Sequence, residues 1–160
     1  MKIFDNPKPA VYMILAFLVG FFLLRSCEVE ASEATLEIGP TFSGEFNGGM
    51  GLVYTERFNG TWDVGTMIMS DQTWNDGNSH AGNNGGLFGQ RIVRYKSFEM
   101  GLGASYWINQ SALIGDEFAW ALSLGWQFND HASLRIRHWS NAGTVDRNRG
   151  QDILTFGWTF

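Results

Sequence analysis

The sequence has few of the residues that several common kinds of site require. Among its 160 residues the only cysteine is Cys27, which excludes an internal disulfide, a cysteine-rich zinc site and a CxxC redox pair. Lys and Arg number 11 against 16 Asp and Glu, and they are scattered, which argues against a nucleic-acid groove. No regular metal-ligand spacing occurs. We therefore expect no metal, no cofactor and no nucleic-acid partner.

Long hydrophobic runs are also scarce, although 44% of the residues are apolar. The mean hydropathy is only -0.12, which excludes a bundle of membrane helices. The chain instead has 20 glycines and 15% aromatic residues, an unusual mixture for a water-soluble α/β domain of this length. The length itself indicates one domain.

The one long apolar run, residues 11–24, lies near the N-terminus after Lys2 and Lys8. It is too short to span a bilayer comfortably, and it is typical of the core of a signal peptide. Cleavage after Ala31 would leave a mature domain of residues 32–160, with residues 1–31 as the signal. Two alternatives stay open: a lipoprotein-type signal ending before Cys27, and a retained anchor. All three send the remaining chain across the inner membrane.

Beyond residue 34 the apolar residues recur with a period of two, which is the period of a β-strand. The pattern is clearest in residues 98–108, 118–128 and 152–160. In each of these segments one face is large and apolar, and the other is small or polar. The large residues of the middle segment are Phe118, Trp120, Leu122, Leu124, Trp126 and Phe128.

Turn sequences rich in Gly, Asn, Asp and Ser divide the chain into eight predicted strands. Their ranges are about 35–43, 49–57, 61–72, 86–95, 98–108, 116–128, 131–140 and 151–160. The connections around Asn59, Ser97 and Asn129 are short and alternate with longer ones. This alternation is typical of outer-membrane barrels, which have tight periplasmic turns and longer outward loops.

The alternation by itself leaves open a soluble eight-stranded barrel or sandwich, whose apolar face would point inward. Three features favour the membrane barrel: the export signal, the small residues that suit a narrow lumen, and the aromatic final strand ending at Phe160. We therefore predict an all-β fold, an eight-stranded antiparallel transmembrane barrel of the outer membrane. Its closure removes the strand edges that lipid could not satisfy.

One group of polar residues lies on the predicted lipid-facing row. Along residues 131–140, Leu134 and Ile136 face lipid, whereas Ser133, Arg135 and Arg137 face the lumen, where the arginines can pair with Glu99 or another acid. His138 and Ser140 continue the lipid-facing row, and counting back from Phe160 puts Asp152 on it as well. The alternating loops place all three at the outer rim.

These three side chains suit acyl transfer. An imidazole can take the proton of a serine hydroxyl, and a carboxylate can orient the imidazole. The spacing of His138 and Ser140 puts their Cβ atoms about 7 Å apart on one face of a strand. Donors for an oxyanion are available nearby in Asn141, the backbone N–H of Gly143 and Asn148. The alternative is that His138 and Ser140 only anchor the rim and that Asp152 only begins a strand.

The segment His138-Trp139-Ser140-Asn141-Ala142-Gly143, followed by Asn148, Gly150 and Asp152, resembles the C-terminal signature of the PagL-type lipid A 3-O-deacylases. These are eight-stranded outer-membrane acyloxyacyl hydrolases. Their signature ends in a Glu fourteen residues after the His, and here Asp152 occupies that place. The resemblance implies His138 as base, Ser140 as nucleophile and Asp152 as orienting acid, with Asn141, Gly143 and Asn148 forming or supporting the oxyanion pocket. Asp is one methylene shorter, so its backbone must lie nearer the His.

The resemblance implies an esterase of the cell outer membrane that removes the acyl chain at the 3-position of lipid A, with lipopolysaccharide as substrate and membrane lipids around it. One alternative is a non-catalytic barrel that anchors, adheres or binds through its loops. Another is an acyltransferase that moves palmitate from phospholipid. The sequence leaves open whether the barrel forms a homodimer.

Overall fold

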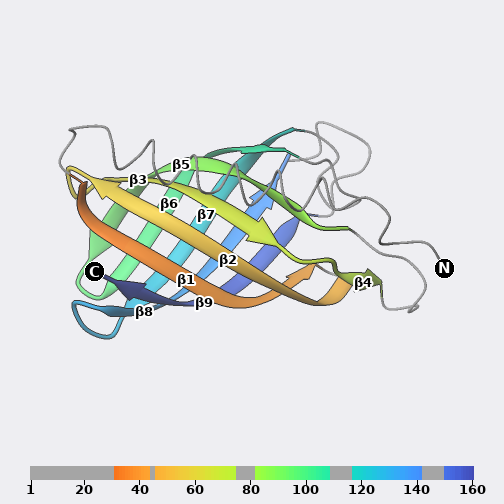
Figure 1. Ribbon diagram of the computed structural model, residues 1–160. Helices are drawn as coiled ribbons and strands as arrows, with labels where there is room; N and C mark the ends of the chain where they lie inside the picture. Colours follow the sequence, from red (N-terminus) through yellow and green to blue (C-terminus); the bar gives the residue numbers. More distant parts are fainter. Residues whose placement is uncertain (1–30, 44–45, 75–81, 109–116, 142–149) are drawn as a thin grey trace.

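The computed structural model describes residues 31–43, 46–74, 82–108, 117–141 and 150–160. Within them the chain forms β-strands only (Figure 1). The elements are β1 (Ala31–Ser43), β2 (Phe46–Phe58), β3 (Trp62–Met69), β4 (Thr73–Trp74), β5 (Asn84–Tyr95), β6 (Phe98–Trp107), β7 (Phe118–Gln127), β8 (Ala132–Ser140) and β9 (Gln151–Thr159). No described helix is long and apolar enough to span a membrane. The predicted signal lies, up to residue 30, outside the described residues.

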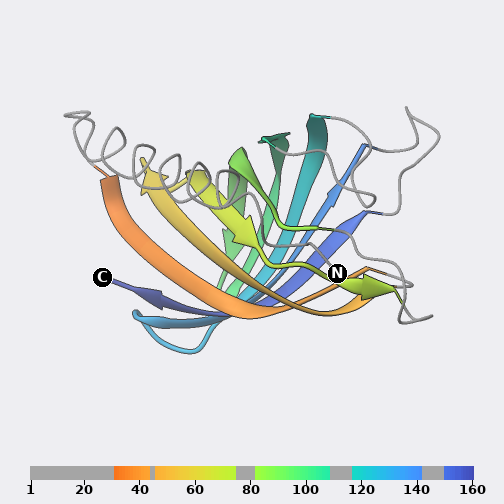
Figure 2. The same cartoon turned by 45° about the vertical axis from the view of Figure 1, so that its right-hand side comes forward.

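The strands close into a barrel. Each long strand is antiparallel to its neighbours in the order β1-β9-β8-β7-β6-β5-β3-β2, and β1 also pairs with β2. Closure is visible where β1 lies between β2 and β9 (Figure 2). The two-residue β4 adds only a short pairing to the start of β2. The prediction of an eight-stranded antiparallel barrel is therefore confirmed.

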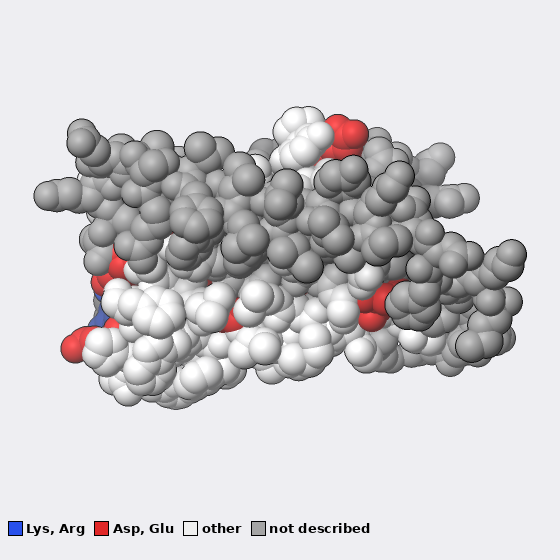
Figure 3. All heavy atoms as spheres, in the orientation of Figure 1, with Lys and Arg blue, Asp and Glu red and all other residues white. Residues whose placement is uncertain are grey.

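The period of two in the sequence corresponds to the two faces of the barrel wall, one facing the lumen and one facing outward. Along β6, β7 and β9 the large apolar residues predicted to face lipid are exposed, and the residues between them are mostly buried in the lumen. On the face where β1 and β2 lie in front, the described lower part of the surface consists mostly of residues other than Lys, Arg, Asp and Glu (Figure 3). An exposed apolar surface of this extent suits a hydrocarbon environment.

Several strand boundaries differ from the prediction, and hydrogen bonds explain the largest shortening. The predicted strand 61–72 stops at Met69 because Ser70 interrupts the ladder: its N–H donates to Met50 O at 2.8 Å, and its Oγ accepts from Met50 N at 2.8 Å. Gln72 then turns into the lumen, where it is buried. The first two strands extend further than predicted, so only residues 44 and 45 separate β1 from β2 in place of a longer loop.

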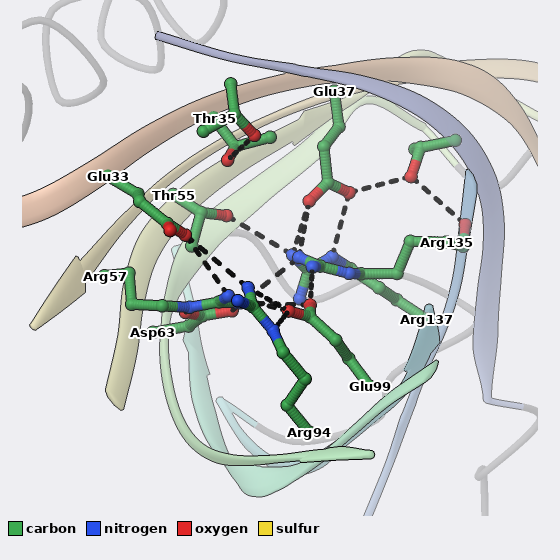
Figure 4. Close-up of polar contacts among 12 residues, drawn as sticks. Glu33, Thr35, Glu37, Thr55, Arg57, Asp63, Arg94, Glu99, Arg135 and Arg137 are labelled. Carbon is green, nitrogen blue, oxygen red and sulfur yellow. Dashed lines mark hydrogen bonds and ion pairs between the residues drawn. The ribbon is translucent and has the colours of Figure 1, made fainter. Parts of the chain in front are cut away.

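The lumen near the short-turn end holds a network of ion pairs (Figure 4). Arg135 Nη1 donates to Glu37 Oε1 at 2.9 Å, and its Nη2 donates to Glu99 Oε2 at 2.5 Å. Arg137 Nη2 binds the same Glu37 Oε1 at 2.7 Å, and Arg57 bridges Asp63 and Glu99. The prediction that both arginines of β8 point inward and pair with Glu99 or another acid is thus confirmed. Arg135 pairs with Glu37 and Glu99, and Arg137 pairs with Glu37.

Towards the other end the lumen is apolar. Its cluster consists of Val53, Met67, Met69, Phe88, Trp107, Ala119, Ala121, Trp139 and Ile153. Trp139 lies edge-on to Trp107, with ring centroids 5.7 Å apart and an interplanar angle of 88°. These close-packed side chains fill the barrel interior.

Candidate active site

The outward row of β8 and β9 carries a histidine and an aspartate in contact. His138 and Asp152 are direct partners in the antiparallel ladder of these strands. Their side chains meet on the outer face, with His138 Nδ1 2.8 Å from Asp152 Oδ1. The two side chains are 41% and 25% exposed, so both remain reachable from outside the barrel. The structure thus brings together two of the three residues predicted to act together.

Cross-strand pairing also explains how the shorter Asp reaches the imidazole. Directly opposite residues in an antiparallel sheet have Cβ atoms about 4.5–5.5 Å apart. At that separation a carboxylate on a single methylene spans the gap to Nδ1. Because Asp152 is one methylene shorter than Glu, its backbone must lie near His138, and the register of β8 against β9 places it directly opposite.

The contact has a defined chemical consequence for the imidazole. An ionised carboxylate accepts hydrogen bonds only, so Nδ1 must be the protonated ring nitrogen in this pair. In the neutral ring, Nε2 then carries the lone pair and can accept a proton. This is the tautomer that a general base needs when it acts on a neighbouring hydroxyl.

Ser140 lies on the same strand and the same outward row as His138. It is half-buried and pairs across the sheet with Trp120 of β7, while His138 pairs with Leu122. Both β7 neighbours are exposed apolar residues. His138 and Ser140 are thus polar residues beside apolar neighbours on the outer face, close to the end of β8.

The residues predicted to bind an oxyanion are only partly described. Asn141 follows Ser140 at the end of β8 and is buried, at 3% exposure. Gly143 and Asn148 lie outside the described residues, so the predicted pocket has one described member. Asn141 also takes part in an interaction with the rest of the molecule.

Lumenal side chains hold the beginning of β9, a feature that the sequence analysis missed. Gln151 Nε2 donates to the backbone carbonyls of Phe42 at 3.4 Å and Asp152 at 3.1 Å. Gln72 Nε2 in turn donates to Gln151 Oε1 at 2.7 Å. From inside the barrel, Gln151 thus connects the strand that carries Asp152 to β1 through Phe42 and to the segment between β3 and β4 through Gln72. The signal in the sequence was only that a glutamine precedes Asp152 on the inward row.

A second polar contact lies on the outward row of β2. Tyr54 donates its hydroxyl hydrogen to Glu56 Oε1 at 2.5 Å, and both side chains are buried. This pair lies towards the short-turn end of the barrel and includes neither an imidazole nor a serine. Among the described residues, no group of three or more His, Cys, Asp or Glu could hold a metal ion. Of these two outward contacts, the one that contains an imidazole is that of His138 with Asp152.

Comparison with solved structures finds the same fold. The crystal structure of Ail, the attachment invasion locus protein of Yersinia pestis, is similar with a TM-score of 0.53 at 16% identity, covering 82% of this chain and 100% of that one. Ail in complex with the heparin analogue sucrose octasulfate matches with a TM-score of 0.44 at 13% identity, covering 80% and 98%. At such low identity, the first similarity supports the barrel fold alone. No curated protein matches the chain significantly.

A family model identifies the activity. The model of the lipid A 3-O-deacylases, named PagL, matches residues 41–160, which include every long strand after the first and the whole of the His138 region. This match favours an ester hydrolase over a non-catalytic barrel. The chain therefore belongs to the PagL family of lipid A 3-O-deacylases.

Proposed function

We propose that this lipid A deacylase acts through Ser140, His138 and Asp152 at the outer rim of the barrel, as nucleophile, general base and orienting acid. The observation that supports this assignment is the 2.8 Å contact between His138 Nδ1 and Asp152 Oδ1 on the outward face, one pleat from Ser140. Polar side chains on a lipid-facing row are costly unless they bind something there. A substrate ester at the membrane surface supplies that reason.

The reaction proceeds in two acyl transfers. Ser140 Oγ attacks the ester carbonyl carbon while His138 Nε2 takes the hydroxyl proton. The bond from that carbon to the sugar oxygen then breaks, and the sugar oxygen receives the proton from Nε2. A water molecule next attacks the acylated Ser140 and gives its proton to Nε2, which returns it to Ser140 Oγ as the acyl bond breaks. The products are a fatty acid and lipid A with a hydroxyl at the 3-position.

Negative charge develops on the carbonyl oxygen in both steps. Asn141, the backbone N–H of Gly143 and Asn148 are the proposed donors to this oxyanion or supports of its pocket. Removing one such donor commonly lowers kcat by about 10²–10³-fold. Asp152 keeps the imidazole in the tautomer that accepts the proton at Nε2 and stabilises the imidazolium once it forms.

The position of the site explains how a lipid that is poorly soluble in water can reach it. The acyl chains of lipopolysaccharide in the outer leaflet lie beside the barrel wall, so the ester at the head-group level meets Ser140 with little extraction. This geometry requires the barrel to sit in the outer membrane with its long connections outward. Residues 1–31 are proposed to direct the export that brings it there.

The test is incubation of the refolded barrel in detergent with lipopolysaccharide, followed by mass spectrometry of lipid A and of the released acid. The expected result is loss of one ester-linked acyl chain and, in H₂¹⁸O, one ¹⁸O atom in the released acid. Ser140→Ala should lower the rate by at least about 10³-fold. Ser97→Ala, at an exposed turn on the opposite end, is the matched control and should keep full activity.

Activity that persists in Ser140→Ala would refute the assigned nucleophile. Appearance of the acyl chain on a second lipid, without a labelled acid, would instead indicate an acyltransferase. Membrane fractionation and heat-modifiable migration on gels test the location. Recovery of the folded chain from the soluble periplasm would contradict the outer-membrane placement.

A further inference from the structure

Gly150 lies directly against the imidazole of His138. Its backbone has a positive φ of 69°, which side-chain-bearing residues rarely adopt. A Cβ atom at this position would lie 2.7 Å from His138 Cε1 and 3.5 Å from His138 Nε2. Two independent constraints, backbone conformation and space, therefore require glycine here. The second of them concerns the proposed base itself.

Ser43 fixes the backbone at this point from the other side of the wall. The ladder between β1 and β9 ends at the pair Phe42 and Asp152. One residue further on, Ser43 Oγ donates to the carbonyl oxygen of Gly150 at 2.6 Å. Ser43 is only 1% exposed and Gly150 is buried, so water does not compete for this bond. The bond extends the attachment of β9 to β1 by one residue and sets the orientation of the Gly150 peptide.

The imidazole is thus confined at two places. Asp152 Oδ1 holds Nδ1, and the Gly150 backbone lies next to Cε1, the carbon between the two nitrogens. Rotation about the last side-chain bond of a histidine is soft. Contacts at these two adjacent ring atoms restrict the rotation of the imidazole, and a base that must take and return a proton in every cycle depends on its orientation.

We propose that Gly150, anchored by Ser43, is a positioning residue for His138 in the deacylation reaction. This inference rests on the proposed role of His138 as general base. It adds two residues, Gly150 and Ser43, which are 107 positions apart in the chain, to the groups that orient the base. Neither is expected to touch the substrate, so their replacement should affect kcat and leave KM nearly unchanged.

The chain offers a matched control for the backbone strain of an alanine at positive φ. Gly60, in the turn between β2 and β3, has a φ of 64°, and a Cβ there would meet nothing within 4 Å. Gly60→Ala therefore carries the same conformational cost as Gly150→Ala without contacting a catalytic group. Any additional loss in Gly150→Ala reports the contact with His138.

The experiment compares the refolded full chain with Gly150→Ala, Gly60→Ala, Ser43→Ala and Ser43→Thr, using lipopolysaccharide in detergent and counting only heat-modifiable, folded protein. We expect Gly150→Ala to lower kcat at least tenfold at unchanged KM, and Gly60→Ala to keep the kcat of the unmodified chain. Ser43→Ala should lower kcat several-fold, and Ser43→Thr should recover part of the loss because it restores the hydroxyl. Equal kcat in the two glycine variants would overturn the proposal.

A second readout does not need activity. Imidazole ¹⁵N and ¹³C NMR signals of His138, assigned by their loss in His138→Asn, report the tautomer and the number of ring environments. We expect one Nδ1-protonated species in the unmodified chain and several, or an exchange-broadened signal, in Gly150→Ala. An unchanged signal in Gly150→Ala would refute positioning. If the unmodified chain released no acyl chain but Gly150→Ala still changed the His138 signal as expected, the proposed function would be refuted and the positioning role would stand.

Discussion

His138 and Trp139 are consecutive residues of β8 that point to opposite sides of the barrel wall. The His138 side chain is 41% exposed on the outer face, and Trp139 is 1% exposed in the lumen. Trp139 packs edge-on against Trp107 and also against Phe88, with ring centroids 6.3 Å apart. The strand segment that carries the proposed base is therefore anchored by one of the largest side chains of the interior.

This anchoring predicts a large effect of Trp139→Ala on stability. Truncating a buried Trp removes its contacts and leaves a cavity, at a cost of about 3–5 kcal/mol. The free energy of unfolding, measured by urea titration of the barrel in detergent micelles, should fall by that amount. Trp126→Ala, which removes an exposed tryptophan of the outer row, should cost clearly less in micelles. Equal losses would contradict the assigned inside and outside of the wall.

Replacement of Asp152 tests the orienting acid. Asp152→Asn keeps the size but can donate to Nδ1, which stabilises the wrong tautomer, so kcat should fall on the order of 10³–10⁴-fold, as in other serine triads. Asp152→Glu restores the carboxylate found in the family signature and should preserve or raise activity. Rates of acyl release from lipopolysaccharide provide the measurement. Equal activity of the Asn and Glu variants would show that the residue is only structural.

The ion network of the lumen predicts unequal effects for two glutamates of β1. Glu37 is fully buried between Arg135 and Arg137, so Glu37→Gln leaves two arginines without their shared partner. Breaking a buried pair in this way costs about 3–5 kcal/mol. Glu33 is 38% exposed and contacts Arg57 at 3.4 Å, so Glu33→Gln should cost no more than about 1 kcal/mol. Comparable midpoints in urea titrations of the two variants would disprove this difference.

The lipid-facing row predicts that a charge on β6 is costly in a bilayer. Leu102 is 59% exposed in the middle of that strand, and Leu102→Arg should destabilise the barrel in phospholipid vesicles by about 2–4 kcal/mol. Ser97→Arg, in the turn, places the same charge near water and should cost little. Reversible folding into vesicles, followed by tryptophan fluorescence, measures both. A neutral effect at Leu102 would mean that this face does not contact hydrocarbon.

The alternation of large and small residues predicted the strands and their two faces, and the export signal, the small residues of the second face and the aromatic final strand then indicated that the apolar face points outward. This succeeds because side chains alternate between the two faces of a strand, a property that each strand has by itself. The same counting predicted that Arg135 and Arg137 point inward and that His138, Ser140 and Asp152 share the outward row. The signature around His138 also indicated the lipid A deacylases, and the family model confirms that the chain belongs to this family.

Only the tertiary structure decided which residues meet. The contact of His138 with Asp152 depends on the register of β8 against β9, and a slip of one residue would turn one of them inward. The sequence likewise held no sign that Ser70 would end β3 by taking over a ladder bond, or that Ser43 would bind Gly150 across 107 residues. Alternation is local to one strand, whereas register and closure are set by the packing of the lumen and by hydrogen bonds between distant segments.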